Sequence, residues 1–252
     1  MLQLDFVYSS PDGIHLRFDC LHPATNEAAP LIVFIHGGGW ISGERENFRE
    51  IADVFVEKGY AAALIQYRLA PLNPFPAAVE DVQAFVRYAR DNSDVLNILP
   101  NRIASFGSSA GGHLAAMLGV TDVVFNGTSS RVNAVVDYSG LTDLRDYKKK
   151  HFDISWSFLE QFMAEPYEGN KDLYKSASPV ALVDSESAPT LIVHGEADDI
   201  VPIAQSQALA AAFTKNNVPY RFISVPGEGH SFSMASWPII ELATLEFLKE
   251  RL

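Results

Sequence analysis

The chain has 252 residues, of which 48% are hydrophobic and 20% charged, and its net charge at pH 7 is −12. This composition is ordinary for a globular protein, and the acidic balance argues against nucleic acid or an anionic membrane as a partner, because both require clustered Lys and Arg. A single cysteine, Cys20, excludes an intrachain disulfide. The first residues lack the features of a signal peptide and no 18-residue apolar run exists, so we expect a cytoplasmic protein. The sequence leaves its oligomeric state open.

The N-terminal segments 2–8 and 14–20 alternate apolar and polar residues on either side of Pro11-Asp12-Gly13. This pattern predicts a half-exposed antiparallel hairpin. Farther along the chain, short apolar runs without alternation predict strands that are buried on both faces of a parallel sheet. These runs cover residues 31–35, 61–65, 103–106, 134–136 and 191–193.

Helical spacing of apolar residues recurs between these runs, over 48–56, 79–89 and 209–213. Alternating strands and helices predict an α/β fold, a mostly parallel sheet with helices on both faces, and we expect one domain over residues 1–252. The segment from about 140 to 188 is longer than an ordinary connection. It contains a predicted helix over 154–163, which is either a peripheral helix or a small cap over the active site.

The most informative motif is Gly107-Ser108-Ser109-Ala110-Gly111, which reads G-x-S-x-G. It lies between a predicted strand and a predicted helix over 112–118, the context in which a sharp turn exposes a serine nucleophile. Only Ser109 is in frame with the motif. We therefore predict Ser109 as the nucleophile of an acyl-transfer site.

A serine nucleophile needs a base, and His230 lies on a loop between Gly229 and Ser231 near the C-terminus. The acid that orients the base is predicted to be Asp198, because it stands in H-G-x-x-D-x-x-V-P directly after a predicted strand. Asp199 and, less directly, Asp143 are alternatives. The order of Ser109, Asp198 and His230 along the chain is that of the α/β-hydrolases.

An oxyanion hole is predicted from His36-Gly37-Gly38-Gly39-Trp40, where consecutive glycines follow a buried strand. Glycines at such a turn let backbone N–H groups face the substrate without a side chain in the way. The N–H of Ala110, at the start of the helix after the nucleophile, would complete the site.

These residues resemble the α/β-hydrolase esterases with an HGGGW motif, including the hormone-sensitive-lipase-like group and, more closely, the small acetyl-xylan and feruloyl esterases labelled BD-FAE. The resemblance runs from about residue 30 to the end and includes Tyr67-Arg68-Leu69-Ala70-Pro71 and the GxSAGG sequence around Ser109. It implies an α/β-hydrolase fold, with Ser109, Asp198 and His230 as the triad and with Gly38, Gly39 and Ala110 as the oxyanion donors.

The resulting hypothesis is a serine carboxylesterase that hydrolyses short-acyl esters, with a small molecule or an acetylated or feruloylated carbohydrate as substrate. Trp40, Trp156 and Phe162 are candidates for substrate contacts. No metal-ligand motif is present, so we expect neither metal nor cofactor. Two alternatives stay open: an amide or formamide hydrolase of the kynurenine formamidase type, and a non-catalytic binding module on a hydrolase scaffold.

Overall fold

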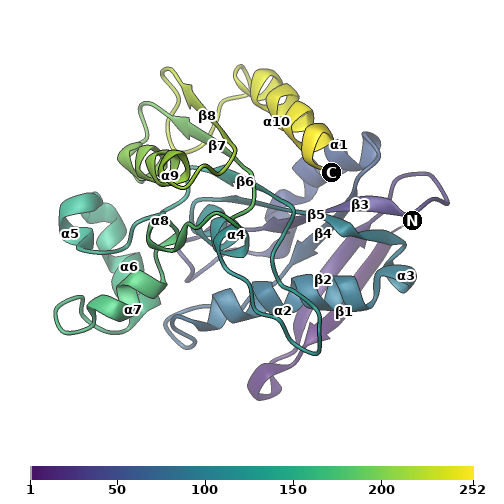
Figure 1. Cartoon of the computed structure of the whole chain (residues 1–252), viewed down its shortest axis with the longest axis horizontal. Helices are drawn as coiled ribbons and strands as arrows, with labels where there is room; N and C mark the ends of the chain where they lie inside the picture. Colours follow the sequence, from purple (N-terminus) through teal and green to yellow (C-terminus); the bar gives the residue numbers. More distant parts are fainter. Residues whose placement is uncertain (1) are drawn as a thin grey trace.

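The computed structural model describes residues 2–252, so Met1 of the predicted domain lies outside the described residues. One eight-stranded sheet runs through the molecule in the order β1-β2-β4-β3-β5-β6-β7-β8 (Figure 1). The strands are β1 Leu2–Ser9, β2 Leu16–Leu21, β3 Ala29–Ile35, β4 Ala61–Ile65, β5 Ile98–Ser108, β6 Ala134–Tyr138, β7 Thr190–Gly195 and β8 Tyr220–Val225. The antiparallel pairs are β1–β2 and β2–β4, and the other five pairings are parallel.

The N-terminal hairpin and all five central strands predicted from apolar patterning are therefore present. The expected α/β architecture, a mostly parallel sheet with helices between its strands, is confirmed. The strand β8 was not predicted. Its residues are half-buried or exposed at the edge of the sheet, so it lacks the continuous apolar run that marks an interior strand.

Helices cover both faces of the sheet. They are α1 Arg49–Glu57, α2 Ala77–Asp91, α3 Ser93–Leu96, α4 Ala110–Val120, α5 Tyr147–Lys150, α6 Trp156–Met163, α7 Lys171–Ser176, α8 Pro179–Leu182, α9 Ala204–Lys215 and α10 Trp237–Arg251. Short 3-10 turns occupy Pro11–Gly13, Arg45–Phe48 and Asp153–Ser155. No helix among residues 2–252 is both long enough and apolar enough to cross a membrane.

The core consists of two apolar layers, one on each face of the sheet. Successive side chains of a strand point alternately into one layer and the other. In β3, Leu31, Val33 and Ile35 point into the layer under α2, α4 and α9, whereas Ile32 and Phe34 point into the layer under α1 and α10. Burial of both strand faces explains why the sequence of β3 is continuously apolar.

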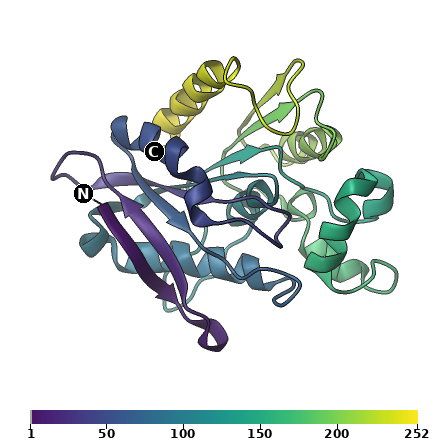
Figure 2. The same ribbon diagram turned by 180° about the vertical axis from the view of Figure 1, so that it is seen from behind.

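The segment between β6 and β7 forms α5 to α8, and α5, α6 and α7 project at one side of the molecule (Figures 1 and 2). The predicted helix over 154–163 is confirmed as a 3-10 turn that leads into α6. The Ser155 hydroxyl donates a hydrogen bond to the Ile200 carbonyl at 2.7 Å, which fastens the start of α6 to the loop after β7. The insertion is thus packed beside the carboxyl ends of the central strands.

Candidate active site

Ser109 lies at the turn between β5 and α4, with φ 59° and ψ −122°. Residues other than glycine rarely adopt a positive φ, and such strain persists where surrounding contacts fix the backbone. Here the Ser109 N–H donates to the Tyr138 carbonyl at 2.8 Å, and the Ser109 carbonyl accepts from the His113 N–H at 3.0 Å. The strained turn is therefore fixed on one side by β6 and on the other by its own helix.

The two glycines of G-x-S-x-G are required by close backbone contacts. A Cβ added to Gly107 would lie 2.1 Å from the Gly111 carbonyl oxygen. A Cβ added to Gly111 would lie 2.0 Å from the carbonyl oxygen of Ile35, the last residue of β3. Only glycine at both positions lets the turn close against the neighbouring strand.

His230 and Asp198 come together from the loops that follow β8 and β7. The His230 Nδ1–H donates to the Asp198 Oδ2 at 2.8 Å, and the Asp198 side chain is fully buried. The other carboxylate oxygen accepts from the N–H groups of Ile200 and Val201, at 2.9 and 2.8 Å. Burial alone would raise the pKa of Asp198, but hydrogen bonds from His194, His230 and Val201 outweigh burial and hold that pKa well below its ordinary value.

The alternative acids lie elsewhere. Asp199 is exposed to solvent next to Asp198. Asp143 pairs with Arg145 at 2.8 Å and with Lys150 at 2.7 Å. The carboxylate that the structure joins to His230 is therefore that of Asp198.

The glycine loop after β3 lies against the Ser109 turn. A Cβ added to Gly37 would lie 3.4 Å from the Ser109 Cβ. Gly38 and Gly39 have φ values of 102° and 60°, which glycine adopts at little cost. Ala110 is buried at the first position of α4, where a helix leaves backbone N–H groups without an intrahelical partner. The residues expected to form the oxyanion hole thus surround the serine, and their role as donors stays a prediction.

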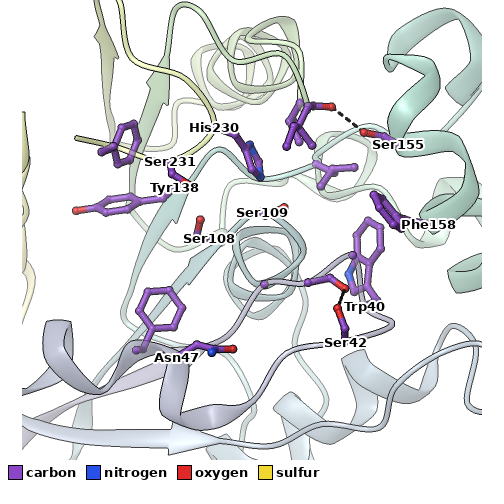
Figure 3. A pocket seen from close by; sticks show the side chains of 18 of the residues that line it. Trp40, Ser42, Asn47, Ser108, Ser109, Tyr138, Ser155, Phe158, His230 and Ser231 are labelled. Atoms are coloured by element: carbon purple, nitrogen blue, oxygen red, sulfur yellow. Dashed lines mark hydrogen bonds between the residues drawn. The ribbon is translucent and has the colours of Figure 1, made fainter. Parts of the chain in front are cut away.

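A pocket of about 560 Å³ opens over Ser109. Figure 3 shows that Ser109 and His230 both face it, with Trp40 and Phe158 on one side and Asn47 below. The lining is largely apolar, and no Asp, Glu, Lys or Arg is among the described residues that line it. The apolar and aromatic part of the lining also includes Phe48, Ile51, Tyr138, Leu141, Ile200, Val201, Phe232 and Trp237.

Of the three predicted substrate contacts, only Trp40 lines this pocket. Phe162 is fully buried and stacks on the far side of Trp40, with ring centroids 4.3 Å apart. Trp156 lies outside the pocket, and its indole N–H donates to the His151 carbonyl at 3.1 Å. Trp156 and Phe162 thus do not line the pocket, and Phe158 is the aromatic residue of α6 that reaches it.

Several pocket residues were missed from the sequence. Asn47 and Ile51 come from the turn and helix after the glycine loop, and Phe232 and Trp237 follow His230. Their one usable signal is proximity in sequence to a predicted catalytic residue or motif, as for Phe232, two positions after His230.

A strained serine at a strand-to-helix turn, with an Asp–His pair on later loops of the same sheet, is the arrangement typical of the α/β-hydrolases. The sequence profile of the BD-FAE family matches residues 18–213. The chain is 33% identical to esterase LipQ of Mycobacterium tuberculosis over 222 residues. The aligned region covers 84% of this chain and 52% of LipQ. The protein therefore belongs to the BD-FAE family, and it spans about half the length of the curated relatives LipQ and LipC.

Solved structures of esterases match the whole fold. A truncated carbohydrate esterase from gut microbiota superimposes with a TM-score of 0.84 at 27% identity, covering 100% of this chain and 96% of that chain. A propionate-bound esterase from Thermogutta terrifontis superimposes with a TM-score of 0.83 at 25% identity, covering 98% and 93%. The described chain is thus similar in extent to these two esterase structures.

Proposed function

We propose that the protein is a serine carboxylesterase in which Ser109, His230 and Asp198 form the catalytic triad. The observation that carries the proposal is the hydrogen bond between Asp198 and His230, whose imidazole enters the same pocket as the strained Ser109. The esterase relatives and the carbohydrate esterase structure support the reaction class.

In the proposed mechanism, Asp198 accepts a hydrogen bond from the Nδ1–H of His230, which leaves Nε2 as the base. His230 Nε2 takes the Ser109 hydroxyl proton while the serine oxygen attacks the ester carbonyl carbon. The carbonyl oxygen gains negative charge and accepts hydrogen bonds from the N–H groups of the glycine loop and Ala110. The imidazolium then protonates the leaving alcohol, and an acyl-serine ester remains. Water, deprotonated by His230, hydrolyses that ester and restores the serine.

The pocket favours a neutral ester. Its described lining holds no charged carboxylate or ammonium group, so a charged acyl or alcohol group would lose hydration there without gaining a partner. We propose short acyl groups, from acetyl to butyryl, because Phe158 and Trp40 limit the space beside the glycine loop. Propionate- and butyrate-bound structures of the Thermogutta terrifontis esterase support this size. We also propose a sugar as the alcohol part of the ester, which the similarity to a carbohydrate esterase supports.

The absence of charged side chains from the described pocket lining weighs against the formamide alternative. N-formylkynurenine carries an ammonium and a carboxylate, and the described lining of the pocket has no opposite charge to bind either group. A non-catalytic binding module would have no need of a serine in a strained conformation beside a buried Asp–His pair.

A hydrolysis screen on the purified protein tests the proposal. We expect turnover of p-nitrophenyl acetate and butyrate, with acetylated xylan and feruloyl esters included as carbohydrate and aromatic substrates. Faster hydrolysis of N-formylkynurenine than of any ester would favour the formamidase alternative. Absence of hydrolysis with every substrate would leave only the binding module.

A further inference from the structure

The triad aspartate has a second histidine beside it. His194, at the end of β7, is fully buried, and its Nε2 lies 3.2 Å from the Asp198 Oδ2, the same oxygen that accepts from His230. His194 Nε2 also lies 2.9 Å from the Val201 carbonyl oxygen. Both neighbours of Nε2 are acceptors, so this nitrogen must carry the hydrogen.

The other ring nitrogen of His194 is held as firmly. Nδ1 lies 2.7 Å from the hydroxyl oxygen of Ser206, which is itself fully buried on α9. With the ring hydrogen on Nε2, Nδ1 accepts the Ser206 hydroxyl proton. The ring is thus fixed in position and tautomer by α9 at one end and by the Asp198 loop at the other.

The contact between His194 and Asp198 is shielded from solvent. The side chains of His194 and Asp198 are both fully buried, so a carboxylate oxygen that lost a donor here would stay without it. His194 faces acidic groups from two directions: Asp198 on the loop after its own strand, and Asp137 of β6, with which it interacts electrostatically. Beyond Asp198 stands His230, which shares Oδ2.

We propose that His194 is a positioning residue of the esterase: its Nε2–H fixes the Asp198 carboxylate that orients His230, and the Ser206 hydroxyl fixes the His194 ring. This inference rests on the proposed triad. The hydrogen bond from His194 partly neutralises the negative charge on Asp198 Oδ2, the oxygen that also faces His230. It therefore weakens the attraction between Asp198 and the imidazolium form of His230. Loss of the donor should therefore make His230 bind its proton more tightly.

Variants that keep or remove the Nε2 donor separate positioning from simple packing. In His194→Gln the amide nitrogen can occupy the place of Nε2, whereas His194→Phe keeps the volume and has no donor. We expect kcat per titrated active site to fall about 10–100-fold in His194→Phe, as for the partners that orient metal-bound histidines, and less than about fivefold in His194→Gln. KM should change little in either variant, because His194 does not line the pocket.

A second readout does not depend on turnover. NMR titration of the His230 imidazole, recorded in the Ser109→Ala background, should show a protonation midpoint higher by about half a pH unit or more in His194→Phe, and close to wild type in His194→Gln. In the active enzymes, the acid limb of kcat/KM should move to higher pH by the same amount. If no ester is hydrolysed, the proposed function fails, but this titration still tests the position of His194.

Ser206→Ala tests the same proposal if His194→Phe does not fold. It removes only the hydroxyl that holds Nδ1, and we expect a smaller change in the same direction. Ser105→Ala is its matched control, because Ser105 is equally buried and its hydroxyl donates to the Ala115 carbonyl, away from the triad. Equal kcat in the Phe and Gln variants, with an unchanged His230 midpoint in the Phe and Ser206→Ala proteins, would overturn the proposal.

Discussion

Trp40 and His113 are joined by a buried hydrogen bond, in which the indole N–H donates to the His113 Nδ1 at 3.1 Å. The His113 Nε2–H donates in turn to the Ala177 carbonyl at 2.9 Å. Burial lowers the pKa of His113 to about 4, so the ring stays neutral and keeps an acceptor for Trp40. The tryptophan that ends the glycine loop is thereby bonded to the helix that begins after the nucleophile.

Trp40→Phe should test this connection. The variant leaves His113 Nδ1 buried without a donor, which should lower the free energy of unfolding by about 1–3 kcal/mol. We also expect a lower kcat, because the glycine loop loses its bond to the nucleophile helix. Thermal denaturation and esterase kinetics measure the two effects. A double-mutant cycle with His113→Leu should show coupling between the positions, and strict additivity would mean that the hydrogen bond contributes nothing.

The two adjacent aspartates should differ sharply. Asp198→Asn leaves His230 without an anionic partner and favours the wrong imidazole tautomer, so kcat should fall about 10³–10⁴-fold. Asp199→Asn, at an exposed position, is the matched control and should stay near wild type. Steady-state kinetics on a p-nitrophenyl ester decide the matter, and the reverse ranking would show that His230 is oriented by another residue.

Asp137 should make stability depend on pH. Burial raises its pKa from 3.8 to about 7, against the attraction of His194 and the backbone of Gly140. Between these two values the folded protein binds more protons at this site than the unfolded chain does, so the contribution of Asp137 to stability falls as pH rises from about 4 to 7. A pKa difference of about 3 corresponds to an upper limit of about 4 kcal/mol.

Asp137→Asn removes this titration and nearly keeps the shape of the side chain. Relative to wild type, the Asn variant should gain stability as the pH increases from 4 to 8, with the gain levelling off above pH 7. Urea denaturation at several pH values provides the comparison. The same free-energy difference between the two proteins at pH 4 and pH 8 would show that Asp137 titrates as an ordinary exposed acid.

Phe158 should limit the acyl chain. Its ring packs on the glycine loop, where a Cβ added to Gly39 would lie 2.9 Å from the ring. In Phe158→Ala, kcat/KM across a series of p-nitrophenyl esters should shift toward longer chains, since each additional buried CH₂ contributes about 0.8 kcal/mol. Trp156→Ala, outside the pocket, is the control. A wild-type optimum at decanoate or longer would contradict the short-acyl proposal.

The sequence predicted those parts of the protein that local patterns determine. Buried parallel strands are continuously apolar, and the turn around Ser109 needs glycines at fixed positions, so both could be recognised without coordinates. The motif H-G-x-x-D includes His194, but its spacing does not show that the His194 ring contacts the Asp198 carboxylate.

The pocket lining depends on how the insertion docks. Trp156, Phe158 and Phe162 all lie on α6, and the choice of which ring enters the pocket follows from tertiary contacts such as the Ser155–Ile200 hydrogen bond. Such contacts join residues far apart in the chain. Apolar spacing within one helix therefore could not distinguish Phe158 from its neighbours.

The most direct test of the central claim is labelling of the nucleophile. A fluorophosphonate incubated with the wild-type protein should modify Ser109 and abolish ester hydrolysis, and peptide mass spectrometry should locate the adduct. Ser109→Ala should resist labelling and lose at least about 10⁴-fold in kcat while it keeps the wild-type melting temperature. Ser108→Ala, which alters the neighbouring pocket serine, should be labelled normally and stay within about tenfold of wild type. An active Ser109→Ala enzyme, or an adduct on any other residue, would contradict the proposed mechanism.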